Sequence, residues 1–204
     1  MDNKQENEST PAINRRRVRR IVVGLSGASG AVYGVRLLTA LKALEVEAHL
    51  VVTGQGAVTL KHEMGMTPSD LTLLATAHHA INHLAAPIAS GSFPTDGMVV
   101  APCSIKTLSG IANSYTDNLM TRAADVTLKE GRPLILAVRE TPLHLGHLRL
   151  MVRAAEIGAL IFPPVPAFYS HPETVEEIVD QSVGRILARL GLDNPLYKVW
   201  GGSG

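Results

Sequence analysis

The feature that most constrains this chain is an alternation of two patterns along most of its length. Short runs rich in Val, Ile and Leu occur at 20–24, 48–52, 97–101, 134–138 and 159–162. Longer stretches, in which apolar residues recur every three to four positions, separate them. Strands that are apolar on successive residues are typical of a parallel sheet covered on both faces. The alternation therefore predicts an α/β fold built of strand–helix units.

Helices are expected at 31–44, 56–64, 117–129 and 145–157, with a last helix after Thr174. Thr174 and Glu177 have the spacing of a capping box, and Gly191 is placed to end that helix. Its expected apolar stripe is Val175, Ile178, Val179, Ile186 and Leu190. Only 67–96 is hard to interpret, and a short helix and a loop are expected there. Right-handed crossovers between these units predict a doubly wound, mostly parallel sheet, a Rossmann- or flavodoxin-like three-layer sandwich.

The length of 204 residues suits one core and is short for two domains. We expect a disordered N-terminal extension over 1–18 and a single domain over 19–200. The arginine-rich segment 15–20 leaves polyanion binding or targeting open as alternatives to a solvated extension. A net charge of +1 gives no global reason to expect nucleic acid or an anionic membrane as a partner.

Signals for location are sparse. No apolar run approaches the ~20 residues of a membrane-spanning helix, and 21–25 is too short for the apolar core of a secretory signal. The single cysteine, Cys103, rules out an internal disulfide and fits a reducing compartment. We therefore expect a cytoplasmic protein with no membrane span.

Ligands of such sheets bind beyond the carboxyl ends of the strands, so the loops that follow the strands are the candidate ligand sites. The first loop reads GLSGASG over 24–30 and leads into a helix. Its glycines permit close backbone approach, and the helix N-terminus offers N–H groups to a phosphate, with Ser26 and Ser29 adding hydroxyls. The spacing is neither the dinucleotide fingerprint nor a P-loop. A phosphate site and an ordinary tight turn both remain open.

The loop after the third strand reads PCSIKTL over 102–108, where small hydroxyl residues again open a helix. Ser104 could be an ordinary N-cap, but two such openings at neighbouring strand ends favour a shared phosphorylated ligand. Arg139 and Glu140 directly follow the fourth strand, and Arg122 and Lys129 come from the helix before it. Because buried charges need partners, these residues form either a structural ion-pair network or a site for a charged ligand.

Three histidines within 78–83 are candidate metal ligands. His79 and His83 have the i, i+4 spacing that could hold a metal on a helix, with His78 beside them. No third ligand is evident, so we expect no metal.

Several segments, taken together, resemble one known family. They are GASGAVYG at 27–34, SGS at 90–92, PCS at 102–104, RAADV with LKE within 122–130, RE with PL within 139–143, and PAFY at 166–169. In this order they resemble the UbiX-type flavin prenyltransferases, formerly described as aromatic acid or 3-octaprenyl-4-hydroxybenzoate carboxy-lyases. The resemblance runs from about 20 to 200.

The resemblance implies a reaction and partners. The family joins dimethylallyl phosphate, or its pyrophosphate, to reduced FMN, first at N5 and then at C6, and needs no metal. The prenylated FMN passes to a UbiD-type decarboxylase, as in ubiquinone synthesis or aromatic acid breakdown. The family forms homo-oligomers, so a dodecamer is expected.

The resemblance also implies site residues. FMN is expected at Gly27, Ala28, Ser29, Thr53, Ser104, Ile105, Lys106, Thr107 and Arg139. The prenyl donor is expected at Ser90, Tyr169 and Arg185, and the catalytic groups are expected to be Glu140, Lys129, Arg122 and Glu63. The cations would stabilise charge on the departing phosphate, and Glu140 would exchange a proton. We expect the FMN phosphate at the first glycine loop, and a fold that gathers the cations beside Glu140.

The chain departs from the family pattern at two places. TGQG at 53–56 replaces a common Ser-Lys pair and so removes a positive charge near FMN, and Val138 replaces a frequent proline. The nearest alternative function is an FMN-dependent cysteine decarboxylase of the homo-oligomeric flavin class. A flavin-binding or storage module without chemistry is a second alternative, and direct decarboxylation of aromatic acids, which rests on the older family name, is a third.

Overall fold

The computed structural model describes residues 19–201, so the predicted extension over 1–18 lies outside the described residues. Within these residues, six parallel strands form one sheet in the order β3-β2-β1-β4-β5-β6. Their bounds are β1 Arg20–Leu25, β2 Glu47–Val52, β3 Ala77–His79, β4 Gly97–Cys103, β5 Leu134–Val138 and β6 Leu160–Ile161. The strand order reverses direction between β1 and β4, which is the doubly wound arrangement that was predicted.

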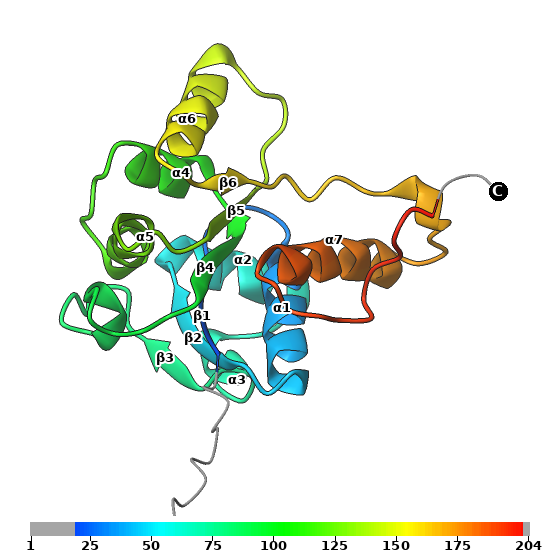
Figure 1. Cartoon of the computed structure of the whole chain (residues 1–204), viewed down its shortest axis with the longest axis horizontal. Helices are drawn as coiled ribbons and strands as arrows, with labels where there is room; N and C mark the ends of the chain where they lie inside the picture. Colours follow the sequence, from blue (N-terminus) through cyan, green and yellow to red (C-terminus); the bar gives the residue numbers. More distant parts are fainter. Residues whose placement is uncertain (1–18, 202–204) are drawn as a thin grey trace, which may run out of the picture.

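Helices cover both faces of the sheet (Figure 1). One face carries α1 (Ala31–Ala43), α2 (Gly54–Met64) and α7 (Val175–Arg189), and the other carries α4 (Ile105–Ala112), α5 (Leu119–Lys129) and α6 (Leu145–Glu156). Successive residues of a strand point to opposite faces, so β4 sends Val99 into the first core and Val100 into the second. Within 19–201 no helix is long and apolar enough to cross a membrane.

Two predicted strand ends differ from the structure. β4 continues through Pro102 to Cys103 instead of ending at 101, because the pairing with β5 is irregular between Val100 and Cys103, where a missing N–H breaks no regular ladder. The last strand comprises only Leu160–Ile161 rather than 159–162. The other strands and the helices lie within about two residues of their predicted bounds, in agreement with the periodicity that located them.

The segment 67–96 holds more structure than was expected. It contains α3 (Pro68–Leu71), the edge strand β3 and the 3₁₀ turn η1 (Pro87–Ala89). β3 is too short to show a period of two in the sequence. Because His78 and His79 lie on this strand, the hypothesis of a histidine pair on a helix is wrong, and residues 19–201 contain no cluster of three metal-ligating side chains.

The last helix begins at its predicted cap, where Thr174 Oγ1 accepts a hydrogen bond from Glu177 N at 3.2 Å. Its buried stripe starts one turn later than predicted, since Val175 is 68% exposed while Val179, Val183 and Ile186 are buried. The first turn of α7 lies out beyond the sheet, at the end of an arm formed by 162–174 with the turn η2 (Phe168–Ser170) (Figure 1).

Candidate functional site

The carboxyl ends of β1 and β4 are tied together by one buried hydroxyl. Ser26 Oγ donates to Pro102 O at 2.9 Å and accepts from Ser104 N at 2.7 Å. Ser26 is 1% exposed, so its hydroxyl is engaged within the protein and does not face a ligand, contrary to expectation. The bridge fixes the two predicted ligand loops relative to each other.

A cavity of about 940 Å³ opens beside these loops, at the point where the sheet order reverses. Such a switch point is where doubly wound sheets bind their ligands. The cavity is lined by Gly27, Thr53, Gly54, Gln55, Ile81, Ser104, Lys106, Thr107, Ser109, Gly110, Asn113, Tyr115, Asp117, Asn118 and Thr121. Five residues predicted at FMN are therefore in its wall, together with a polar α4–α5 connection that sequence reasoning missed.

Three helices begin at this cavity, and one of them, α5, is capped by Asn118, which accepts from Thr121 N at 3.1 Å. Thr53 caps α2 by accepting from Gly56 N at 2.9 Å, and Ser104 caps α4 by accepting from Thr107 N at 3.3 Å. The amino ends of all three helices bring partial positive charge to the wall, where Lys106 of α4 adds a full charge. An anionic group is therefore favoured at this end of the cavity.

The first loop meets α2 closely at Gly27. A Cβ built on Gly27 would overlap the Cβ of Gln55, so only glycine permits this approach. Of the other predicted FMN residues, Ala28 is buried beside this contact, and Ile105 packs against the second core rather than lining the cavity.

The N-terminus of α1 is occupied by a carboxylate. Glu63, on α2, accepts hydrogen bonds from Gly30 N at 2.9 Å and from Ala31 N at 2.8 Å. Desolvation alone would raise the pKa of Glu63, but hydrogen bonds from Ser29, Gly30 and Ala31 and the nearby Arg139 charge outweigh it and lower that pKa. The amides that the sequence suggested for a phosphate thus hold Glu63 here.

Arg139 extends this group from the end of β5. Its backbone N donates to Cys103 O at 3.1 Å, and its side chain packs with Tyr33 over Gly30. Burial raises the pKa of Tyr33, and the charge of Arg139 partly opposes that rise. Glu63, Arg139 and Tyr33 therefore form one polar group at the mouth of the first loop. Tyr33 was not predicted as a site residue, although it belongs to the GASGAVYG segment.

Ser90, Arg122 and Lys129 form a second group, which we call the η1–α5 cluster. Arg122 Nε donates to Ala89 O at 3.1 Å, which holds its side chain beside Ser90. Arg122 also pairs with Asp125 at 3.0 Å, and Lys129 pairs with Glu130 at 2.9 Å. The cluster is partly exposed and lies on the face of the sheet that carries α5.

Tyr169 and Arg185 lie on the opposite side. Arg185 lines a cavity of about 220 Å³ between α7 and the arm, and Tyr169 belongs to the arm itself. Within one chain, Arg122 and Lys129 lie on the opposite face of the sheet from Arg185, because α5 packs on one core and α7 on the other. Glu140 is exposed after β5, where it accepts from Thr141 N at 3.1 Å.

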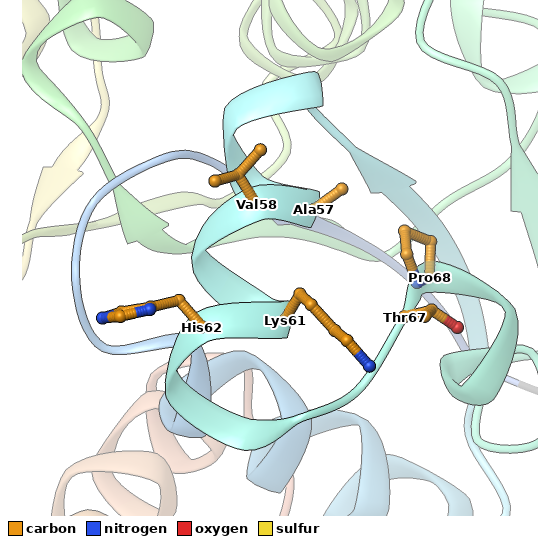
Figure 2. Close-up of a pocket in the computed structure, with 6 residues that line it drawn as sticks. All are labelled: Ala57, Val58, Lys61, His62, Thr67 and Pro68. Carbon is orange, nitrogen blue, oxygen red and sulfur yellow. The ribbon is translucent and has the colours of Figure 1, made fainter.

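Figure 2 shows another hollow, of about 700 Å³, over the outer side of α2. Its wall consists of Ala57, Val58, Lys61, His62, Thr67 and Pro68, none of which was predicted as a site residue. The Lys61 ammonium donates to Gly65 O at 3.0 Å, so it is engaged with the end of its own helix. This hollow shares no lining residue with the cavity at the strand ends.

Comparison with known proteins agrees with this geometry. The sequence model of the Flavoprotein family matches residues 9–187. The flavin prenyltransferase UbiX of Salmonella typhimurium is 54% identical over 189 residues, which is 91% of this chain and 100% of that protein. The crystal structure of AnUbiX (PadA1) in complex with FMN and dimethylallyl pyrophosphate superposes with a TM-score of 0.90 at 49% identity, covering 92% of this chain and 100% of that one.

A second structure bears on assembly. The dodecameric FMN-dependent UbiX-like decarboxylase of Escherichia coli O157:H7 superposes with a TM-score of 0.87 at 47% identity, covering 90% of this chain and 100% of that one. The FMN-dependent cysteine decarboxylase SpaF, which represents the alternative function, shares only 19% identity at a TM-score of 0.58 and 72% coverage of this chain. That likeness concerns the fold alone.

Proposed function

Because this chain belongs to the Flavoprotein family and, within it, to the UbiX-type flavin prenyltransferases, we propose that it attaches a dimethylallyl group to reduced FMN bound in the 940 Å³ cavity. The observation that carries this proposal is the cavity at the sheet's switch point, with Gly27, Thr53, Ser104, Lys106 and Thr107 in its wall. We take 19–200 as one flavoprotein domain.

The phosphate of FMN belongs at the amino ends of α2 and α4. Glu63 occupies the N-terminus of α1, and the helix N-termini at the cavity are those capped by Thr53, Ser104 and Asn118. The Asp117 carboxylate beside Asn118 disfavours an anion at the α5 end, so the ends of α2 and α4 suit the phosphate. Lys106 supplies a cation near the position where related chains carry the lysine that TGQG lacks. The proposed phosphate position therefore differs from the sequence-based prediction, which placed the phosphate at the N-terminus of α1.

Reduced FMN supplies the nucleophilic atoms of the transfer, N5 and then C6. The remaining predicted FMN residues, Ser29 and Arg139, form the mouth of the site together with Glu63. Glu63 is held as a charged carboxylate by backbone amides, so it can orient the first loop and accept a flavin hydrogen bond.

The donor site is shared between subunits. The η1–α5 cluster and Arg185 lie on opposite faces of one chain, yet both suit a phosphate, and a dodecameric relative shows that similar chains assemble. We therefore assign Ser90, Arg122 and Lys129 of one chain, with Tyr169 and Arg185 of a neighbour, to the same prenyl phosphate in a dodecamer.

Transfer breaks the allylic C–O bond, and the bonding electron pair remains on the departing phosphate. Arg122, Lys129 and Arg185 stabilise that negative charge as fixed donors. One net proton leaves the flavin as the new bonds form, and Glu140 passes it to the released phosphate. No electrons are exchanged in this balance, and no metal takes part.

The product of this reaction is a modified flavin, which fits transfer to a UbiD-type decarboxylase as recipient. We propose that the protein works in the cytoplasm, since its single cysteine, Cys103, fits a reducing compartment.

The decisive experiment incubates the protein with reduced FMN and dimethylallyl phosphate and records the mass spectrum of the flavin. A mass gain of one prenyl group supports the proposal. An unmodified flavin, with turnover instead of a cysteine-containing substrate, would support the decarboxylase alternative, and FMN binding without any turnover would support a storage module.

Variants test the residue roles. Lys129→Ala and Arg185→Ala should each weaken donor binding by about one to two decades while FMN stays bound, because one charge-assisted contact is lost. Glu140→Gln should bind both ligands and turn over slowly. Full activity of Glu140→Gln would contradict its role, and equal losses of melting temperature without rate changes would indicate purely structural charges.

Mixing tests the shared site. Arg122→Ala and Arg185→Ala homo-oligomers should both be impaired, but co-expressed chains should form some sites that carry both intact arginines and so recover activity. Co-expressed Arg122→Ala and Lys129→Ala chains are the matched control, because those residues come from the same subunit and a mixed assembly restores no intact site. Recovery in neither mixture would contradict sharing between subunits.

A further inference from the structure

A buried amide on α7 connects the arm to the C-terminal end of the described chain. Gln181 is 4% exposed. Its Nε2 donates to Tyr169 Oη at 2.9 Å and to Lys198 O at 3.1 Å, and its Oε1 accepts from Lys198 N at 2.8 Å. Both hydrogens of the side-chain amide are therefore used in hydrogen bonds, one to each of two segments that lie far apart in the sequence.

The segment 194–200, which we call the C-terminal strap, lies along α7 and ends at Tyr169. A Cβ on Gly184 would come within 2.9 Å of Tyr197 N, so the strap lies directly on the helix there, and Asn194 Nδ2 donates to Gly184 O at 3.0 Å. At its far end the Trp200 ring meets the Tyr169 ring edge-on, with centroids 5.6 Å apart. Between the arm and the strap, Gln181 bonds to both, and Lys198 Nζ adds a direct hydrogen bond from the strap to Ser170 O at 3.1 Å.

The hydrogen-bond arrangement leaves the Tyr169 hydroxyl free to change partner. Tyr169 Oη donates its one hydrogen to Lys198 O at 3.1 Å, an oxygen that also accepts from Gln181. If the hydroxyl turned to donate to a phosphate, Lys198 O would keep its bond from Gln181, and Tyr169 Oη would keep the bond it accepts. No buried polar group is then left unpaired, so the rotation carries little penalty.

Gln181 and Arg185 are one turn apart and line the same 220 Å³ cavity. We propose that Gln181 is a positioning residue for prenyl transfer, holding the Tyr169 oxygen and the strap in place so that the Tyr169 hydroxyl can turn toward the donor phosphate at Arg185. The inference rests on the proposed function, because it assigns the donor phosphate to Tyr169 and Arg185.

The experiment uses the FMN-loaded full chain and two near-isosteric variants. Gln181→Met removes the amide, and Gln181→Glu places a carboxylate without N–H groups against two oxygens. Both should raise the KM for dimethylallyl phosphate about ten-fold or more and leave the Kd for FMN unchanged, since FMN residues lie at another cavity. In a Tyr169→Phe background, Gln181→Met should add much less to KM, because its effect passes through the missing hydroxyl.

Trp200, the only tryptophan of the chain, reports on the strap without any substrate. Trp200 is 63% exposed, so the anisotropy of its emission, rather than its wavelength, should fall in Gln181→Met as its ring loses its contact with Tyr169. Asp180→Asn is the matched control, since it breaks the ion pair of α7 with Arg36 but does not touch the strap. It should lower the melting temperature and leave both KM and the anisotropy of Trp200 emission at wild-type values.

The outcomes separate the two proposals. Wild-type protein that binds FMN but forms no prenylated flavin would contradict the proposed function and this role with it. Normal wild-type turnover, with an unchanged donor KM in Gln181→Met, would overturn only the role of Gln181. A raised KM that is matched by Asp180→Asn would likewise overturn it, because general weakening of α7 would then explain the effect.

Discussion

At the scale of single residues, the candidate site is organised by a few side chains that satisfy the backbone at strand and helix ends. Ser26 joins the ends of β1 and β4, and Glu63 holds the start of α1. The backbone amides that donate to these side chains are no longer available to a ligand. The amides of Gly30 and Ala31, for example, donate to Glu63 and therefore do not bind a phosphate. This is why we propose the FMN phosphate at the neighbouring helix ends, where Lys106 lines the cavity.

Gln55→Glu tests the proposed position of the FMN phosphate, because it adds one negative charge with almost no change in side-chain size. The carboxylate would lie in the cavity wall at the start of α2 and repel the FMN phosphate, so FMN affinity should fall about ten-fold. Riboflavin, which lacks the phosphate, is the control ligand and should bind the variant as it binds the wild type. Equal weakening of both ligands, measured by flavin fluorescence titration, would contradict a phosphate at this helix end.

His49 predicts how stability depends on pH. Burial, with the nearby His79 and Arg20, lowers the pKa of His49 from 6.5 to about 4. Because the folded-state pKa is depressed, the neutral ring contributes its stability above pH ~6.5, and that contribution is lost as the pH falls toward 4. For one proton, the unfolding free energy declines by at most about 1.4 kcal/mol per pH unit over this range. His49→Gln should make that decline less steep.

Urea unfolding at a series of pH values measures that decline. His62→Gln is the matched control, because His62 is exposed on α2, and it should follow the wild-type curve. A His49→Gln curve with the same slope as wild type would show that other groups govern acid sensitivity.

At the scale of elements, the position of α1 is set by how closely it packs on the central strands. A Cβ on Gly34 would overlap Ala101 O and lie 2.8 Å from Leu25 Cγ. The helix can therefore press its Gly34 face against β4, which brings its N-terminus to Glu63 and Arg139. The same elements that form the first core thus place the first glycine loop.

Gly34→Ala should destabilise the protein by about 1–3 kcal/mol, because the methyl group forces α1 away from the sheet. Gly54→Ala is the matched control in the apo protein, since nothing lies within 4 Å of its Cβ. There the better helix propensity of alanine should leave stability unchanged or raise it by up to about 1 kcal/mol. Similar melting temperatures for the two variants would mean that α1 has room to move.

At the scale of the whole molecule, the surface carries apolar side chains that the single chain does not cover. On α6, Leu145, Leu148 and Val152 are 58%, 45% and 56% exposed. Contiguous exposed apolar groups of this kind mark association surfaces. They agree with the proposal that neighbouring subunits complete the donor site, for which a dodecameric relative is the precedent.

Val152→Lys should weaken assembly, because a lysine ammonium would be desolvated at the α6 contact. Light scattering should show smaller species, and prenyl transfer should fall with them while FMN remains bound to the dissociated chains. Leu73→Lys changes a 76% exposed residue that lies away from α6 and should leave the mass unchanged. A Val152→Lys variant with wild-type mass and activity would exclude α6 from the interface.

Outside 67–96, the sequence alone determined the succession of strands and helices and the cap at Thr174, because periodicity and caps act over a few neighbouring residues. It also supplied the motifs of the family. Partners distant in sequence were decided only by tertiary packing. The Ser26 bridge spans 76 positions, and Glu63 reaches Gly30 across 33. Likewise, Arg122 and Arg185 are separated because α5 and α7 pack on opposite faces of the sheet. The sequence pattern of a helix shows which of its sides is apolar, but it does not show which face of the sheet that side covers.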